Sequence, residues 1–169
     1  MTSADAQTIA HFLLATLETE IPVTTRVFSA VPGDRLDYRP DSVSKTALGL
    51  LRHITLEDEW FLNAVTDGRF APAPDDSDAC RLMTPADAIA HYSQRMPVAI
   101  ARARTLPGEA FMREIDLMGA FRLPAIEFLS MMVRHSVHHR GQLSAYLRAM
   151  GAKVPGIYGP SADSATALA

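Results

Sequence analysis

Four long segments of the sequence carry apolar residues at three- and four-residue intervals, with proline and glycine in the stretches between them. This spacing places the apolar side chains on one face of an α-helix. The segments cover residues 4–31, 45–66, 84–105 and 124–150. No convincing strand pattern interrupts them. The pattern therefore predicts an all-α protein built as a four-helix bundle.

Helix boundaries follow from capping residues and helix breakers. The expected N-caps are Ser3, Ser44 and Thr84. The expected stops of the second and fourth helices are Gly68 and Gly151. Pro22 and Pro97 fall inside the first and third patterns, where proline is expected to kink a helix. The linker 109–123 has room for an extra turn.

Composition limits the class of protein. A chain of 169 residues with 48% hydrophobic content can form one domain over residues 1–169, with a frayed tail at 161–169. The net charge is −3 with no basic stripe, so no nucleic-acid partner is expected. No apolar run approaches the ~20 residues of a membrane span, and no signal peptide is recognisable. The single cysteine, Cys80, excludes an internal disulfide and fits a reducing cytoplasm.

Three of the six histidines lie within residues 131–141, in the fourth helical segment. His135 and His139 are four residues apart and therefore share a helix face. Two imidazoles at that spacing can bind one divalent metal ion, with Zn–N distances of ~2.0–2.1 Å. His138 is rotated by about 100° from His139 and is not expected to join them. The ordinary alternative is a chance pair packed against the core.

A further histidine, His53, lies in the second helical segment. Helical bundles build metal sites from side chains on facing helices, so His53 can complete a three-nitrogen set with His135 and His139. Three protein ligands are typical of an open, catalytic site. Glu57 lies one turn beyond His53, where it is either a catalytic base or partner of an imidazole, or an exposed acid.

Other charged residues have less specific interpretations. Arg52, Arg134 and Arg140 are candidates to neutralise an anionic substrate, although such arginines are usually solvated or paired. The acidic run 75–78 is expected to be solvated. It lacks the glycine and the terminal glutamate of an EF-hand loop, which argues against calcium.

The sequence His-Ser-Val-His-His-Arg-Gly-Gln-Leu at residues 135–143 resembles the signature of the DinB-like superfamily. Residues 50–54, followed by acids and Trp60, are similar to the early element of that family. Residues 150–159 resemble its tail. The resemblance covers residues 5–160, and the histidine–arginine–glycine–glutamine run is its most specific part.

This resemblance implies an up-down-down-up bundle, often a homodimer. It also implies a divalent metal, most often zinc or nickel, held by His53, His135 and His139. Characterised relatives include transferases and isomerases that use mycothiol, bacillithiol or glutathione, whose thiol pKa the metal is thought to lower. Two classes of function stay open: a metal-dependent enzyme acting on a small molecule, as a thiol S-transferase or a hydrolase, and a non-catalytic metal-binding or dimerising bundle. A metal with an open position beside a pocket would distinguish the first.

Overall fold

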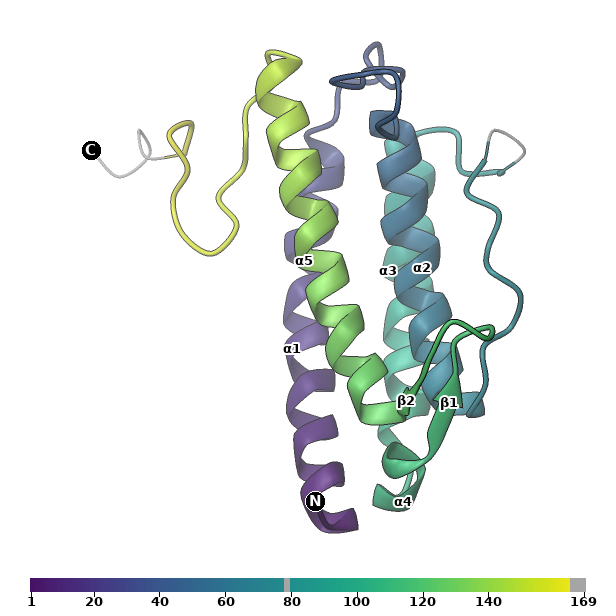
Figure 1. Ribbon diagram of the computed structural model, residues 1–169. Helices are drawn as coiled ribbons and strands as arrows, with labels where there is room; N and C mark the ends of the chain where they lie inside the picture. The colour runs from purple at the N-terminus through teal and green to yellow at the C-terminus, as the bar shows by residue number, and fades with distance from the viewer. Residues whose placement is uncertain (78–79, 165–169) are drawn as a thin grey trace.

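The computed structural model describes residues 1–77 and 80–164. Its four long helices are α1 (Ser3–Ser29), α2 (Ala47–Asp67), α3 (Pro85–Arg104) and α5 (Ala125–Ala149). The first and last of these run in one direction along the bundle, and the middle two run in the other (Figure 1). The predicted all-α fold and the up-down-down-up topology are therefore confirmed.

Side-chain caps mark the start of α1, α2 and α3. The prediction at Thr84 is confirmed, since its side chain accepts from the Asp87 backbone in a capping box. The other two predicted caps are wrong by a few residues. Thr2, not Ser3, caps α1, and Thr46, not Ser44, caps α2. In both places two hydroxyl residues compete, and backbone geometry selects the one whose oxygen reaches the N3 amide.

Glycine in the left-handed conformation ends two of the helices, as predicted. Gly68 has φ 72° at the end of α2, and Gly151 has φ 77° after α5. The prolines expected to kink the other two helices lie inside them: α1 continues through Pro22 and α3 through Pro97.

The segment between α3 and α5 contains more structure than predicted. The expected extra turn is α4 (Gly108–Met112). A two-stranded antiparallel hairpin then follows, β1 (Glu114–Asp116) paired with β2 (Arg122–Pro124). The expectation of no strand is therefore wrong at this point. Strands of three residues are too short to give a recognisable alternation in the sequence.

Each helix packs against two others around one apolar core. α1 contacts α3 and α5, and α2 contacts the same two helices. Because α2 and α3 run in the same direction, the chain must return along the whole bundle between them, and residues 68–77 and 80–84 lie on its outside (Figure 1). Among residues 1–77 and 80–164, no helix is both long and apolar enough to cross a membrane.

The chain beyond α5 folds back beside the bundle (Figure 1). Asp163 pairs with Arg148 of α5 at 2.7 Å and accepts a hydrogen bond from the Val154 amide. Fraying was expected over 161–169, and within that range these polar contacts link Asp163 to α5 and to Val154. Residues 165–169 lie outside the described part of the chain.

Candidate metal centre

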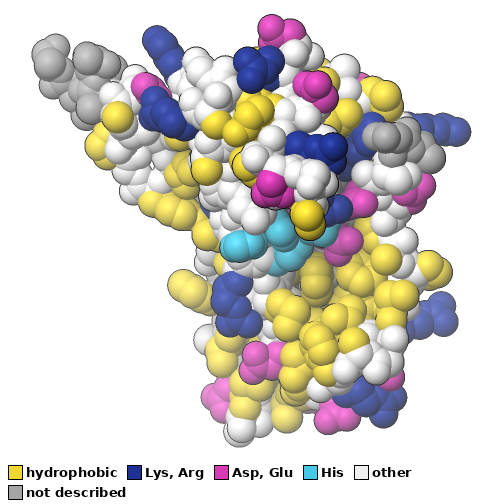
Figure 2. Space-filling view, turned by 45° about the horizontal axis from the view of Figure 1, so that its top comes forward, with side chains coloured by type: hydrophobic (Ala, Val, Ile, Leu, Met, Phe, Trp, Pro, Cys, Tyr) yellow, Lys and Arg dark blue, Asp and Glu magenta, His cyan; other side chains and the backbone are white. Residues whose placement is uncertain are grey.

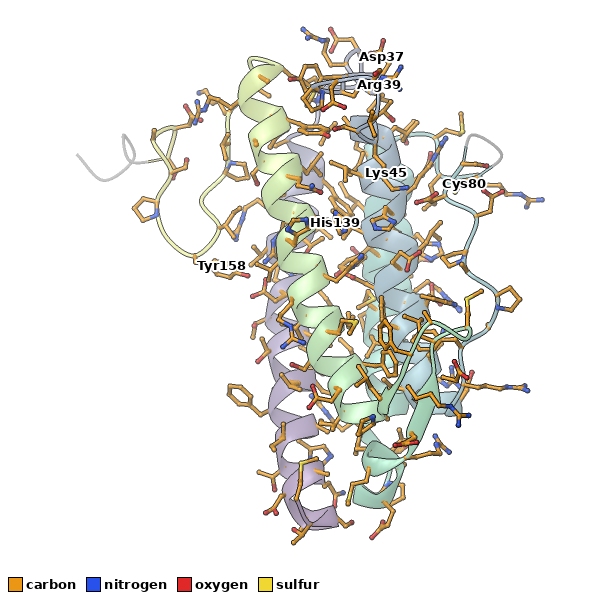
Figure 3. The ribbon with its side chains drawn as sticks, in the orientation of Figure 1. Asp37, Arg39, Lys45, Cys80, His139 and Tyr158 are labelled. Carbon is orange, nitrogen blue, oxygen red and sulfur yellow. The ribbon has the colours of Figure 1, made fainter. Side chains whose placement is uncertain are left out.

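The histidines predicted as ligands come together between α2 and α5, which are neighbouring antiparallel helices. The Nε2 atom of His53 lies 3.1 Å from Nε2 of His135 and 3.2 Å from Nε2 of His139. Their ligand nitrogens all lie within 4.8 Å of one another. His139 lies on the face of α5 that is turned toward α2 (Figure 3). His138 is exposed and does not belong to the group, as expected from its rotation on the helix.

The opposite nitrogen of each ring faces a hydrogen-bond acceptor. Nδ1 of His53 lies 3.1 Å from Asp76 Oδ2. For His139, Nδ1 lies 2.7 Å from the side-chain oxygen of Gln142. The third pair, Nδ1 of His135 and Oδ1 of Asp58, is 3.7 Å apart, and neither atom has another partner in the described part of the chain. These acceptors favour the tautomer with the proton on Nδ1 in all three rings.

That tautomer leaves three unprotonated Nε2 atoms pointing at one another. Neutral imidazole has one donor and one acceptor nitrogen, so no ring has a proton left to place between the Nε2 atoms. A cation at their centre would satisfy all three. In tetrahedral coordination with Zn–N distances of ~2.0–2.1 Å, two nitrogen ligands lie roughly 3.3 Å apart. The Nε2 atoms here are separated by similar distances, 3.1 Å and 3.2 Å. The donor set therefore fits a divalent transition metal.

Burial favours the uncharged form of two of these rings, His53 and His139. It lowers the pKa of His53 to about 4, and the neighbouring His135 and His139 add to this effect. Burial also lowers the pKa of His139. Only a neutral imidazole can bind a metal. His53 and His139 are therefore in their binding form at neutral pH.

The acceptors beside the rings are themselves fixed. Asp58 is fully buried and accepts a 2.8 Å hydrogen bond from the Tyr92 hydroxyl. Burial and the Asp58 charge raise the pKa of Tyr92 well above its usual value, so the hydroxyl stays protonated and donates. On the other side, Asp76 accepts from Lys45 Nζ at 2.7 Å. Burial alone would raise the pKa of Asp76, but hydrogen bonding and the charge of Lys45 hold it below its ordinary value.

Glu57, the candidate catalytic base, is half-buried one helical turn beyond His53. Burial raises its pKa, and the charge of the nearby Asp76 carboxylate reinforces this effect. It makes no hydrogen bond to any of the three rings within the described residues. Glu57 is therefore not the carboxylate that orients an imidazole, and a role in proton transfer remains a prediction.

Two of the three arginines proposed to bind a substrate have a structural role instead. Arg52 is buried and donates to the backbone oxygens of Leu82 and Ser77, which ties the 69–83 segment to α2. Arg140 is buried against α1, where it pairs with Glu20. Arg134 is exposed and donates to Ser130.

The histidine cluster reaches the surface between two unlike regions. Figure 2 shows histidine side chains on one face of the molecule, with acidic groups beside them and hydrophobic side chains below. Phe61 is one of the apolar neighbours, with its ring centroid 5.7 Å from that of His135. Two further aromatic rings extend this apolar wall, since Phe61 packs on the buried Phe128 and on the partly buried Phe70. The cluster is thus open on one side and backed by the core on the other.

Comparison with known protein families gives a match. The sequence model of the DinB family matches residues 6–167 of this chain. The chain belongs to the DinB family. It is 29% identical to the uncharacterised protein YjoA of Bacillus subtilis over 147 residues, which cover 86% of this chain and 90% of YjoA. It is also 29% identical to YrdA of the same organism over 159 residues, covering 93% of this chain and 92% of YrdA.

Two crystal structures of DinB-like proteins share the fold. That of Bacillus subtilis YjoA superposes with a TM-score of 0.69 at 22% identity, covering 88% of this chain and 99% of YjoA. That of a DinB-like protein from Bacillus cereus has a TM-score of 0.72 at 20% identity, covering 86% of this chain and 95% of the other. At these identities the likeness establishes the architecture alone.

Sequence reasoning missed the three acceptors around this DinB-family site. Gln142 follows His139 by three residues, a spacing that places both on one helix face and gives a usable signal. Asp58 follows Glu57 directly in the sequence. Glu57 is four residues after His53 and shares its helix face, so the sequence pattern pointed to Glu57 and not to Asp58. Asp76 belongs to the acidic run that was expected to be solvated, and this expectation is wrong because a long-range contact recruits it. Asp78, of the same run, lies outside the described residues.

Proposed function

We propose that this DinB-family protein binds one divalent metal ion through His53, His135 and His139 and uses it to act on a small molecule. The observation that carries the proposal is the arrangement of the three rings. Each turns Nε2 toward a common point and Nδ1 toward an acceptor, as metal-binding histidines do. Imidazole ligands suit zinc and nickel, which are the favoured ions.

Three protein ligands leave room for a further group, which is the pattern of catalytic sites. Three neutral imidazole ligands would not offset the positive charge of a divalent ion, as carboxylate or thiolate ligands do. The ion would therefore act as a Lewis acid and lower the pKa of a bound water or thiol. Asp58, Asp76 and Gln142 keep the rings in one tautomer and orientation. In this proposal Glu57, whose pKa burial raises, accepts the proton released by that water or thiol.

The reaction is one that needs such a nucleophile: transfer to a low-molecular-weight thiol, or hydrolysis. Membership of the DinB family supports the thiol, because this is the chemistry that the resemblance implied. Cys80 lies in the segment between α2 and α3 and is not one of the clustered side chains. A sulfur nucleophile would therefore come from a cosubstrate.

Metal content tests the site itself. Purified protein incubated with zinc or nickel and then desalted should retain about one ion per chain, measured by mass spectrometry of the metal. Replacing all three histidines with alanine should abolish retention, whereas His138→Ala should leave it unchanged. Equal metal content in the wild type and in the triple variant would refute the proposal.

Cobalt substitution tests the chemistry. Titration of the cobalt protein with glutathione, bacillithiol or mycothiol should give a sulfur-to-metal charge-transfer band at neutral pH. Glu57→Gln should keep the metal but slow thiol transfer to 1-chloro-2,4-dinitrobenzene. Glu59→Gln, the control, should not, because Glu59 pairs with His91 and Arg95 of α3. If no thiol changes the cobalt spectrum, a thiol transferase is ruled out. The functions that remain are a hydrolase and a non-catalytic bundle.

A further inference from the structure

A pocket of about 150 Å³ lies next to the histidine cluster on the side where α2 begins. The residues lining it are Ser44, Lys45, Leu50, His139, Gln142 and Tyr146. His139 belongs both to this lining and to the cluster, so one imidazole separates the pocket from the three Nε2 atoms. At ~30 Å³ per water molecule, the volume equals about five waters, which suits a short charged group and not a whole drug-sized ligand.

The polar lining of this pocket is rich in hydrogen-bond donors. Lys45 has three N–H donors, of which Asp76 takes one. The oxygen of Gln142 faces His139 Nδ1, so the free end of its amide is the NH₂ group. The hydroxyl of Tyr146 is committed as a donor to the Lys45 backbone oxygen. No carboxylate is among the six lining residues.

Asp76 limits the charge of Lys45 but does not cancel its capacity to bind. The same Oδ2 atom of Asp76 that pairs with Lys45 also faces Nδ1 of His53. Its negative charge is therefore shared between two donors. Lys45 itself is 42% exposed, so its remaining N–H groups are open to an incoming anion.

The apolar part of the lining suits a short hydrocarbon link. Leu50 is buried, and the Tyr146 ring is held edge-on against Tyr38 with centroids 5.4 Å apart. These side chains are fixed by packing, so the wall is in place before a ligand arrives. A group that enters here therefore meets hydrogen-bond donors, an apolar wall and one histidine of the cluster.

We propose that this pocket binds the carboxylate of a small-molecule substrate or cosubstrate whose reacting atom lies at the three histidines. Lys45 and the Gln142 amide donate to the carboxylate, and Leu50 and Tyr146 contact the adjoining methylene groups. The proposal rests on the proposed function for the position of the reacting atom. Carboxylate binding in the pocket is independent of the proposed function and can be measured without a metal.

The sequence offers a direct probe, because Lys45 and Lys153 are its two lysines. Biosynthetic incorporation of ¹³C-labelled lysine keeps the charge and all three N–H donors of each and gives each a separate NMR signal. Adding propionate to the metal-free protein should shift the Lys45 signal and leave that of Lys153 in place, relative to sodium chloride at equal ionic strength. Equal shifts of both signals, or none, would overturn the carboxylate site.

Zinc-loaded protein tests the link to the histidines. The probes are 3-mercaptopropionate and its neutral analogue 3-mercaptopropan-1-ol, measured by calorimetry. The acid should bind about tenfold more tightly, as expected for a hydrogen bond to a charged group. Equal affinity would overturn the proposal. Failure to load zinc would refute the proposed function instead, while the propionate experiment still decides the pocket.

Variants of the two lysines complete the test. Lys45→Met should reduce the tenfold preference for the acid to near unity, and Lys45→Arg should retain most of it. Lys153→Met is the matched control and should change nothing. The metal content of each variant is measured alongside. A preference that survives in Lys45→Met would overturn the role of Lys45.

Discussion

At the scale of single residues, the site is defined by what each imidazole does with both of its nitrogens. A lone histidine pair on a helix says little, because either nitrogen could point at a metal or at solvent. Here Asp76, Gln142 and Asp58 take one nitrogen of each ring, and this selects the tautomer that leaves Nε2 unprotonated. The acceptors thus set the chemistry of the histidines.

The contribution of one acceptor can be isolated with two adjacent acids. Asp76→Asn should weaken zinc binding about tenfold or more, because removing a partner of a ligating histidine typically costs 10–100-fold in affinity. Asp75→Asn removes the same charge one residue away, where the carboxylate accepts a hydrogen bond from the Ser77 amide of its own loop. It should leave the affinity within about twofold. Competition with a chromogenic chelator measures both, and equal losses would contradict the role of Asp76.

The low pKa of His53 predicts how the metal-free protein responds to acid. The pKa is about 4 in the folded chain against an ordinary value of 6.5. Between these pH values the unfolded chain binds a proton at His53 that the folded chain does not. The free energy of unfolding should therefore fall as the pH drops from 6.5 to 4. Urea unfolding of His53→Gln should show a flatter profile over this window, and identical slopes would contradict the assignment.

At the scale of elements, two buried arginines attach irregular segments to the helices. Arg52 holds the 69–83 segment, which carries Asp76, against α2. Arg140 donates to Thr24 of α1 at 2.9 Å and also contacts Tyr158 of the tail. Both arginines lie close to ligating histidines in the sequence, so a role in substrate binding was a reasonable hypothesis. Burial shows that their role is to fix the position of neighbouring segments.

Stability measurements can separate a buried arginine from an exposed one on the same helix. Arg140→Met should lower the free energy of unfolding by about 3–5 kcal/mol, because it removes the cationic partner of the largely buried Glu20 carboxylate and leaves it the Tyr158 hydroxyl. Arg148→Met breaks the more exposed pair with Asp163 and should cost less than about 1 kcal/mol. Urea denaturation followed by circular dichroism gives both values. Equal losses would contradict the buried pairing.

Helical elements were predictable because their signals are local. Apolar periodicity located α1, α2, α3 and α5, and Thr84, Gly68 and Gly151 marked ends that the structure confirms. The errors arise where a signal is too short or depends on distant residues. The β1–β2 hairpin has strands of three residues, and the tail is held by Arg148 through a contact 15 residues away.

At the scale of the whole molecule, the topology creates the site. His53 is separated from His135 by 82 residues and from His139 by 86, yet α2 and α5 pack as antiparallel neighbours and bring all three together. The sequence predicted this group because the bundle fold follows from periodicity and the family resemblance supplies the order of helices. It could not predict that the 69–83 segment returns along the bundle and delivers Asp76. That contact depends on the path of a long connection, which local patterns do not specify.

The outer surface of α1 suggests how the molecule assembles. Ile9 and Phe12 are three residues apart on one helix face, with 44% and 71% of their surface exposed. Exposed apolar groups on a folded protein often mark an interface. The resemblance implied a homodimer, and we expect a two-fold dimer in which this face of α1 meets its copy.

Sedimentation equilibrium at tens of micromolar tests the dimer. The wild type should have twice the monomer mass, and Phe12→Asp should sediment as a monomer because the interface would bury an unpaired carboxylate at the two-fold axis. Val43→Asp is the control, since Val43 is 93% exposed in the loop before α2, away from that face. It should remain a dimer. A monomeric wild type would refute the dimer, and a dimeric Phe12→Asp variant would place the interface on another face.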